Sequence, residues 1–211
     1  HLDQAGLRDT TLVIFTSDNG APSRQGSADS GRRVDMTLDS AGSNGPLRGW
    51  KWHLREGGIR VPFIARWPGR IPARRTDTTS VLNICDLTPT FIRLGGASMP
   101  KGYQPDGVDM TDALFGKPFG RSQPMFWHNP TANRRGPVLA IREGDWKLLM
   151  EPDGSEIELY DLAHDLSESV NVADANPGAV KTLAAKLRVW HQSLPKPLDR
   201  PFVNEKPRAK Q

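Results

Sequence analysis

Three consecutive polar residues and the glycine that follows them could contribute to a metal site. Ser17-Asp18-Asn19-Gly20 follows the apolar run 11–16, and Asp18 and Asn19 place a carboxylate beside an amide oxygen. Hard oxygen atoms of this kind are the ligands that calcium and magnesium prefer. Two ligands do not complete a shell of about six to eight oxygens, so other residues would have to supply the remainder. The same four residues also suit an ordinary Asn-Gly turn, and on the residues alone this alternative stays open.

A second group of reactive side chains lies in residues 47–62, a glycine-punctuated segment that carries several cations and two tryptophans. Lys51 could present a point charge to an anionic group. His53 could contact a substrate or donate a proton. The pair Gly57-Gly58 would let the backbone approach a ligand closely. A solvent-exposed lysine and a histidine without a chemical role are the competing interpretations.

Four further side chains have two interpretations each. His128 could face a cleft or satisfy a structural role within a strand. Trp50 and Trp52 could line a pocket for a carbohydrate ring, or they could pack against the rest of the fold. Cys85 lies in an apolar run with a helical pattern, which favours a buried structural thiol over a reactive one.

Apolar patterns predict the elements that position the first group. Residues 11–16 are β-rich and continuously apolar, which predicts a strand buried on both faces, as in a parallel sheet. In open α/β sheets, ligands bind beyond the carboxyl ends of such strands. Residues 59–67 predict a second strand, and residues 81–94 predict a helix that Gly95-Gly96 ends. Residues 1–9 have the pattern of a helix end.

A second region is predicted to begin near residue 97, after which residues 97–123 form a Gly/Pro-rich connection. Turn residues then separate four short strand candidates, which predicts an antiparallel meander over 124–128, 138–142, 146–150 and 158–161. A helix should begin at Asn176-Pro177. Its apolar face should pack on the small sheet through Val180, Leu183, Ala184, Leu187, Trp190 and Leu194. We therefore expect an α/β fold divided into residues 1–96, residues 97–194 and a Pro/Lys-rich tail over 195–211.

Composition excludes several classes of protein. The chain has 211 residues, of which 36% are hydrophobic and 25% charged, so a buried core is expected. The net charge of +4 is scattered, which argues against a nucleic-acid partner and is compatible with a small anionic substrate. Apolar runs fall short of the length of about 18 residues that a membrane span needs. The single cysteine allows no internal disulfide and does not fix the compartment. If the chain is part of a longer protein, we expect that protein to be periplasmic or secreted.

The order and spacing of five segments resemble the sulfatase family, which belongs to the alkaline-phosphatase-like superfamily. These segments are TLVIFTSDNG, LRGWKWHLREGGIRVPFIARWPG, DLTPTFIRLGG, AIREGDWKLL and ELYDLAHD. The resemblance covers about residues 1–194. It implies the C-terminal portion of a sulfatase-type α/β sandwich, followed by a small antiparallel sheet with a packed helix.

The resemblance also implies a chemistry. Sulfatases hydrolyse sulfate esters with a formylglycine nucleophile made from a Cys or Ser in a C-x-P-S-R-type motif, and a calcium ion holds the sulfate. Asp18 and Asn19 match the family's late pair of metal ligands, with magnesium the less favoured ion. Lys51 matches the lysine that contacts the sulfate, which makes it the catalytic and substrate-binding candidate. His53 matches no catalytic position of the family, and its contact with substrate is a hypothesis from residue type.

The sequence departs from the family's pattern in ways that affect its activity. It contains no C-x-P-S-R motif and no N-terminal aspartate pair, and Cys85 in ICDLTPT matches a structural helix. We therefore expect the C-terminal part of a sulfatase, whose partner is the N-terminal half of the same domain. Alone, it should not hydrolyse a sulfate ester, and its unpaired apolar surface should make it marginally stable or prone to associate.

Two alternative functions are carried forward. The first is a phosphonate or phosphate ester hydrolase of the same superfamily. The second is a non-catalytic module that binds a carbohydrate or sulfate. On the leading interpretation, the ligand is a sulfated small molecule or carbohydrate.

Overall fold

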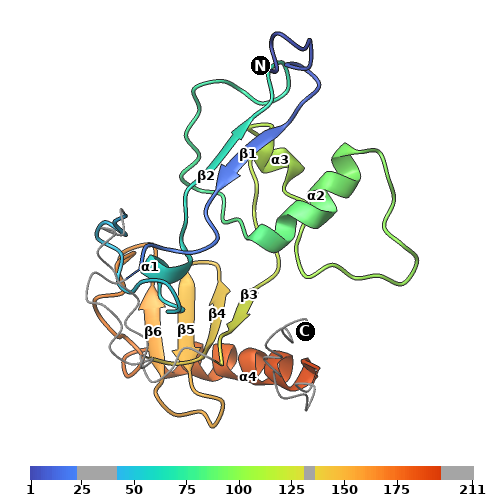
Figure 1. Ribbon diagram of the computed structural model, residues 1–211. Helices are drawn as coiled ribbons and strands as arrows, with labels where there is room; N and C mark the ends of the chain where they lie inside the picture. Colours follow the sequence, from blue (N-terminus) through green and yellow to red (C-terminus); the bar gives the residue numbers. More distant parts are fainter. Residues whose placement is uncertain (23–41, 131–135, 196–211) are drawn as a thin grey trace, which may run out of the picture.

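Two antiparallel sheets organise the chain, and helices pack against both of them (Figure 1). The structure is a computed structural model that describes residues 1–22, 42–130 and 136–195. The smaller sheet pairs β1 (Val13–Thr16) with β2 (Phe63–Arg66). The larger one contains four strands from the second half of the chain. This mixed α/β architecture confirms the predicted fold class.

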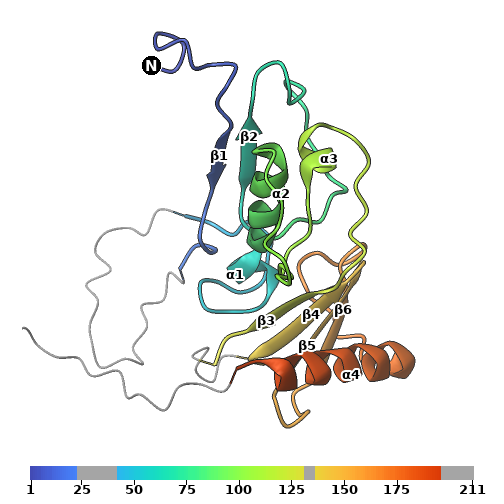
Figure 2. The same ribbon diagram turned by 90° about the vertical axis from the view of Figure 1, so that its right-hand side faces the viewer.

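The smaller sheet is covered on one face only. Phe63 and Ala65 pack with a core built around Met110 and Leu114, to which α2 (Leu87–Leu94) and α3 (Thr111–Leu114) contribute. On the other face, Phe15 and its register partner Ile64 are 63% and 60% exposed. Figure 2 shows α2 beside this two-stranded sheet.

The predicted parallel, doubly buried strand is therefore wrong for the described residues. Strand β1 runs antiparallel to β2, and alternate residues along it are exposed. Strand β1 reads as a continuous apolar run because it carries apolar side chains on both faces of the smaller sheet. The described part of the chain covers only one of these faces. Residues 1–9 form successive turns, and the predicted helix end is not observed there.

The predicted helix over 81–94 is confirmed in its second half and begins with a tighter turn, η2 (Ile84–Asp86). The thiol of Cys85 is exposed, which corrects the prediction of a buried one. Its neighbour Asp86 takes the interior position and is fully buried. The Asp86 carboxylate accepts hydrogen bonds from the backbone N–H groups of Asn83 and Val108 and pairs with Arg121 at 2.6 Å. These partners compensate the charge for its loss of water, so Asp86 rather than Cys85 points inward.

The larger sheet is the predicted meander. Its order is β3 (Met125–His128), β4 (Leu139–Glu143), β5 (Trp146–Met150) and β6 (Glu158–Asp161), each antiparallel to the next. Gly144, with φ of 60°, forms the tight β4–β5 turn in a backbone conformation that glycine adopts without strain. The connection predicted over 97–123 contains the short helix α3.

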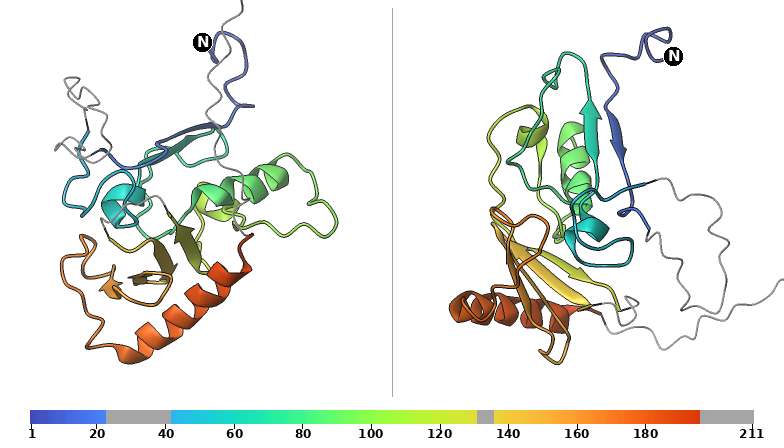
Figure 3. Two further views of the ribbon diagram at one scale, coloured as in Figure 1. Left: turned by 60° about the horizontal axis from the view of Figure 1, so that its bottom comes forward. Right: turned by 90° about the vertical axis from the view of Figure 1, so that its left-hand side faces the viewer.

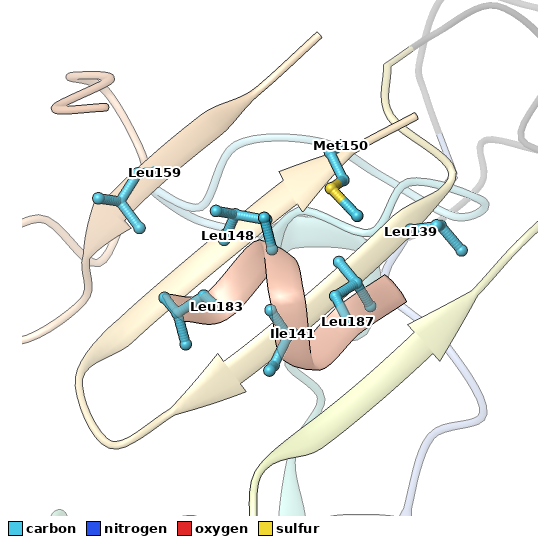
Figure 4. Packing of buried hydrophobic residues seen from close by; sticks show 8 residues of the cluster. Leu139, Ile141, Leu148, Met150, Leu159, Leu183 and Leu187 are labelled. Carbon is cyan, nitrogen blue, oxygen red and sulfur yellow. The ribbon is translucent and has the colours of Figure 1, made fainter. Parts of the chain in front are cut away.

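Helix α4 (Pro177–Ser193) covers one face of this sheet, as the apolar spacing predicts. Leu183 and Leu187 insert between side chains of the three strands β4, β5 and β6, which include Ile141 and Leu148 (Figure 4). Pro177 begins the helix as expected. The Asn176 side chain does not cap it, because the amide donates instead to the carbonyl of Val172 at 2.9 Å.

The opposite face of the larger sheet meets residues 48–60, including the short helix α1 (Glu56–Ile59). Figure 3 shows α1 and α4 on opposite sides of the sheet. Among the described residues, no helix combines the length and apolar character of a membrane span. The predicted tail lies outside the described residues from 196 onward.

Candidate active site

The Ser17–Gly20 segment leaves the end of β1 as a loop. Asp18 is exposed and Asn19 half-buried, while Gly20 is buried. The Asp18 carboxylate accepts a hydrogen bond from the Asn19 N–H at 3.0 Å, and the Ser17 hydroxyl donates to the Asn19 carbonyl at 2.9 Å. These local bonds fix the loop and leave a carboxylate and an amide at the end of a strand. The loop thus follows the end of a strand, as predicted, while its role in binding a metal stays a prediction.

Three glycines join this loop to residues 48–60. Gly20 donates its N–H to the carbonyl of Gly58 at 2.9 Å. A Cβ on Gly20 would collide with the carbonyl of Gly57, and one on Gly58 would lie 2.6 Å from the carbonyl of Trp50. Only residues without side chains allow two backbone segments to approach this closely. We call this contact between Gly20, Gly57 and Gly58 the glycine joint.

Further hydrogen bonds reinforce the glycine joint. Lys51 donates its backbone N–H to the carbonyl of Ala21 at 3.1 Å. The Asn44 side chain accepts from Ala21 N–H at 2.7 Å and donates to the carbonyl of Gly49 at 3.0 Å. The structure therefore brings the predicted metal pair and Lys51 into one joined unit, although they are separated by about thirty residues of sequence.

The loop tip carries the other predicted residues. The ammonium of Lys51 lies 5.6 Å from the ring centroid of Trp52, which is half exposed. Trp52 has φ of 80°, a conformation that is costly for a bulky residue and that tends to occur at functional sites. His53 is buried, with its ring centroid 4.1 Å from that of Trp50. Its contact with substrate stays a prediction.

Residues on or next to the larger sheet contact this loop at three points: Arg48, Trp52 and Arg55. Arg48 donates to the Tyr160 hydroxyl at 3.0 Å and to the carbonyl of Glu168 at 3.1 Å. Arg55 pairs with Glu158 on β6. The side-chain amide of Asn129, next to β3, donates to the carbonyl of Trp52 at 2.8 Å. Residues far along the chain thus determine the conformation of the loop.

A buried charge cluster lies under α1. The ammonium of Lys147 lies 2.9 Å from a carboxylate oxygen of Glu56 and 2.8 Å from one of Glu168. Glu168 also accepts the Glu56 backbone N–H at 2.6 Å, and Arg60 binds the second oxygen of Glu56 at 2.6 Å. We call Glu56, Lys147 and Glu168 the buried triad.

The triad's two carboxyl groups respond differently to this environment. Burial favours the neutral form of Glu56, but the attraction and hydrogen bonds of Lys147 and Arg60 outweigh it, so its pKa lies below the usual value. Burial dominates at Glu168, whose pKa is raised despite Lys147. Nearby, burial and the hydrogen bond to Glu158 raise the pKa of Tyr160 to about 12, which keeps this phenol neutral.

Asp18 and Asn19 fit a divalent cation as two of its ligands. Both are hard oxygen donors on adjacent residues at a strand end. Over residues 1–22, 42–130 and 136–195, no group of three or more His, Cys, Asp or Glu side chains is arranged to hold a metal. Asp18 and Asn19 would therefore need further donors to complete a metal shell.

Two other candidates lie away from these loops. His128 meets His191 of α4 edge to face at 4.8 Å, on the helix side of the sheet, and burial and the neighbouring His191 lower its pKa. The exposed Cys85 belongs to η2. Neither shares an observed contact with the glycine joint.

The triad residues Lys147 and Glu168 were not predicted from the sequence. Lys147 interrupts an apolar strand, and such a lysine normally points to solvent. One sequence signal could have indicated that Lys147 is buried. It lies within the apolar strand Trp146–Met150, whose other residues are largely buried on both faces of the sheet.

The fold and the two joined loops define an α/β protein in which the Asp18-Asn19 loop follows the end of a strand and the Lys51 loop rests on a C-terminal meander. Comparisons with known proteins specify this class further. Residues 1–97 match the Sulfatase family model. A sulfatase of Formosa agariphila is 31% identical over 202 residues, covering 88% of this chain and 34% of the relative. Human arylsulfatase A is 31% identical over 204 residues, covering 84% and 37%.

Solved structures agree with these relatives. The crystal structure of Ps i-CgsB has a TM-score of 0.71 and 27% identity, over 90% of this chain and 38% of the other. A Bacteroides thetaiotaomicron protein connected with glycosaminoglycan metabolism also has a TM-score of 0.71, with 28% identity over 90% and 41%. The chain belongs to the sulfatase family. It spans about a third of the length of the curated relatives it matches.

Proposed function

We propose that this chain is the C-terminal part of a sulfuric ester hydrolase and contributes ligands for both metal and sulfate to its active site. In this proposal, Asp18 and Asn19 bind calcium and Lys51 contacts the sulfate group of an aryl or carbohydrate ester. The nucleophile, a formylglycine, and the remaining metal ligands belong to the N-terminal half of the same domain. Family membership supports the reaction class.

The glycine joint is the observation that carries the proposal. It ties the Asp18-Asn19 pair to the segment of Lys51 through the bonds of Gly20 to Gly58 and of Lys51 to Ala21. Asp18 and Asn19 as metal ligands and Lys51 as a sulfate contact can serve the same reaction only if they are held close together. An ordinary turn and an ordinary surface lysine would not need this glycine packing.

Each residue then has a distinct task. The Lys51 ammonium stabilises negative charge on the transferring sulfuryl group, where fixed cations contribute most. Asp18 and Asn19 orient the cation through a carboxylate and an amide. Calcium, when bound there, would act as a Lewis acid on a sulfate oxygen. His53 and Trp50, packed together beneath the tip, would support the substrate side of the loop.

The uncovered face of the smaller sheet supports the assignment to a longer chain. Val13, Phe15 and Ile64 are exposed apolar residues on one face of β1 and β2. Soluble proteins normally bury such a face against another layer. We propose that the N-terminal half of the domain covers it.

The test uses the full-length protein encoded by the natural gene. We expect hydrolysis of an aryl sulfate well above that of the matching aryl phosphate, and loss of activity on calcium removal. Lys51→Ala should lower kcat/KM for the sulfate ester by about 100-fold, as removal of one transition-state contact does elsewhere. Lys181→Ala, an exposed lysine of α4, is the matched control and should leave kcat/KM unchanged.

Other outcomes would replace the proposal with one of its alternatives. A preference for phosphate or phosphonate esters would assign the protein to another branch of the superfamily. Binding of sulfated carbohydrate without turnover, in a gene that lacks a C-x-P-S-R motif, would indicate a binding module. Turnover by the purified 211-residue chain, with contaminating sulfatase excluded, would contradict the assignment of the nucleophile to the N-terminal half.

A further inference from the structure

The lysine of the buried triad has no assigned task. We propose that Lys147 is a positioning residue, which holds α1 through Glu56 and Glu168 and thereby sets the placement of Lys51 and the Asp18-Asn19 pair. The inference deepens the proposed function and rests on it for the roles of Lys51, Asp18 and Asn19. The positioning itself is a property of the chain and can be measured without turnover.

Burial makes Lys147 an unusual residue for a plain structural role. Its side chain is fully buried on the sheet face that packs against residues 48–60. Charged groups lose hydration on burial, and a buried ion pair often contributes no more stability than apolar residues of similar volume. A structural role alone would thus be served by an apolar side chain. A buried ammonium instead fixes direction, because both of its carboxylate partners must meet it at once.

The bonds of the triad lead from the sheet to the candidate site. Glu168 bonds Lys147 and also accepts the backbone N–H of Glu56, the first residue of α1. Two residues further, the carbonyl of Gly58 accepts the N–H of Gly20. In the other direction, Gly57 donates its N–H to the carbonyl of Arg48 at 2.8 Å, at the base of the Lys51 loop. A shift of α1 would therefore move both parts of the site.

Glu168 adopts an unfavourable backbone conformation that its surroundings must impose. Its φ of 55° lies in the left-handed region, which costs energy for a residue with a side chain. The same residue is fully buried. Strained conformations of this kind persist where the surrounding structure imposes them, commonly at functional sites.

Removing the ammonium should release α1 from the larger sheet. Without Lys147, the carboxylates of Glu56 and Glu168 face each other in a buried space. Arg60 still binds Glu56, but it is partly exposed, and Arg142 is 4.0 Å away. Because burial already raises the pKa of Glu168, this carboxyl group would take up a proton, and both ion pairs that tie α1 to β5 would be lost.

The first experiment measures hydrogen exchange in the 211-residue chain by mass spectrometry. For Lys147→Met, we expect exchange in residues 48–60 to rise at least tenfold, while exchange in α4 changes little. Lys186→Met is the matched control, since Lys186 pairs with Glu143 at 2.6 Å but lies exposed on α4. A uniform rise over all peptides, or none in residues 48–60, would overturn the positioning role. If Lys147→Met does not fold, Glu168→Gln must raise exchange in the same segment.

The second experiment links positioning to the reaction in the full-length protein. Lys147→Met should lower kcat/KM for an aryl sulfate by about 100-fold, as a displacement of about 1 Å can, with a clear rise in KM. Mere loss of folded protein would lower kcat and leave KM unchanged. Lys147→Arg, which keeps a cation between the two carboxylates, should retain at least tenfold more kcat/KM than Lys147→Met. Equal loss in both variants would contradict the proposal.

The two experiments separate the inference from the proposed function. If the unmodified full-length protein hydrolyses no sulfate ester, the proposed function fails while the exchange experiment still decides on positioning. If sulfate hydrolysis is present and Lys147→Met leaves KM and local exchange unchanged, the positioning role alone is wrong.

Discussion

At the scale of single residues, Gly57 shows how little space the candidate site leaves. A Cβ there would lie 2.6 Å from the carbonyl of Arg48 and still closer to that of Gly49. Backbone atoms cannot yield as a flexible side chain can, so the loop would have to separate from α1. The site therefore depends on a residue that has no functional group.

We expect Gly57→Ala to destabilise the chain by about 3 kcal/mol, toward the upper end of typical single substitutions. Gly120→Ala is the control, because nothing lies within 4 Å of the added Cβ. Chemical denaturation of both variants measures the free energy of unfolding. Equal stability of the two variants would show that α1 and the base of the Lys51 loop are not packed as tightly as described.

The sequence suggests candidate reactive side chains, but it does not reveal the residues that hold them. Asp18, Asn19 and Lys51 stand out because their residue types and neighbours suggest ligands. Lys147 and Glu168 do not, because they lie 91 and 112 residues from Glu56. A strand pattern says which residues alternate, but not which distant loop will cover the outer face of the sheet. Only the three-dimensional fold shows that residues 48–60 do so.

At the scale of elements, α4 and the meander form the apolar core most fully predicted from sequence. Helical spacing and turn residues are local signals, and the structure confirms both the helix and the four strands. Strand β1 was predicted as an element, but its pairing and exposure were not, because an apolar run does not reveal which of its faces the described chain covers.

Leu187 gives this core a direct test. It is fully buried between α4 and the sheet. Leu187→Ala should lower the free energy of unfolding by about 2 to 5 kcal/mol, through lost burial and the cavity left behind. Val189→Ala is the matched control on the same helix, where the side chain is 69% exposed, and it should change stability by less than about 0.5 kcal/mol. Thermal or denaturant unfolding followed by circular dichroism measures both.

At the scale of the whole molecule, the uncovered face of the smaller sheet should govern behaviour in solution. Exposed apolar strands promote association between chains. We expect the 211-residue chain to associate as its concentration rises, and the double variant Phe15→Thr, Ile64→Thr to remain monomeric over the same range. Sedimentation velocity distinguishes these states.

The control for association is Val170→Thr, which changes an apolar residue that is 59% exposed but lies in a loop after β6. It should associate like the unmodified chain. A monomer at every concentration for the unmodified chain would show that the exposed face is harmless. If Val170→Thr reduced association as much as the double variant at Phe15 and Ile64, association would not depend on β1 and β2.

The distance along the chain between Glu56 and Glu168 also has a consequence for biosynthesis. The Glu56 N–H finds its acceptor 112 residues later. At about 5 to 20 residues per second, the ribosome needs about 6 to 22 seconds to add that stretch. Throughout this interval the nascent loop has its reactive side chains but lacks the platform that arranges them. The candidate site can therefore take its final arrangement only after the C-terminal meander and Glu168 have been translated.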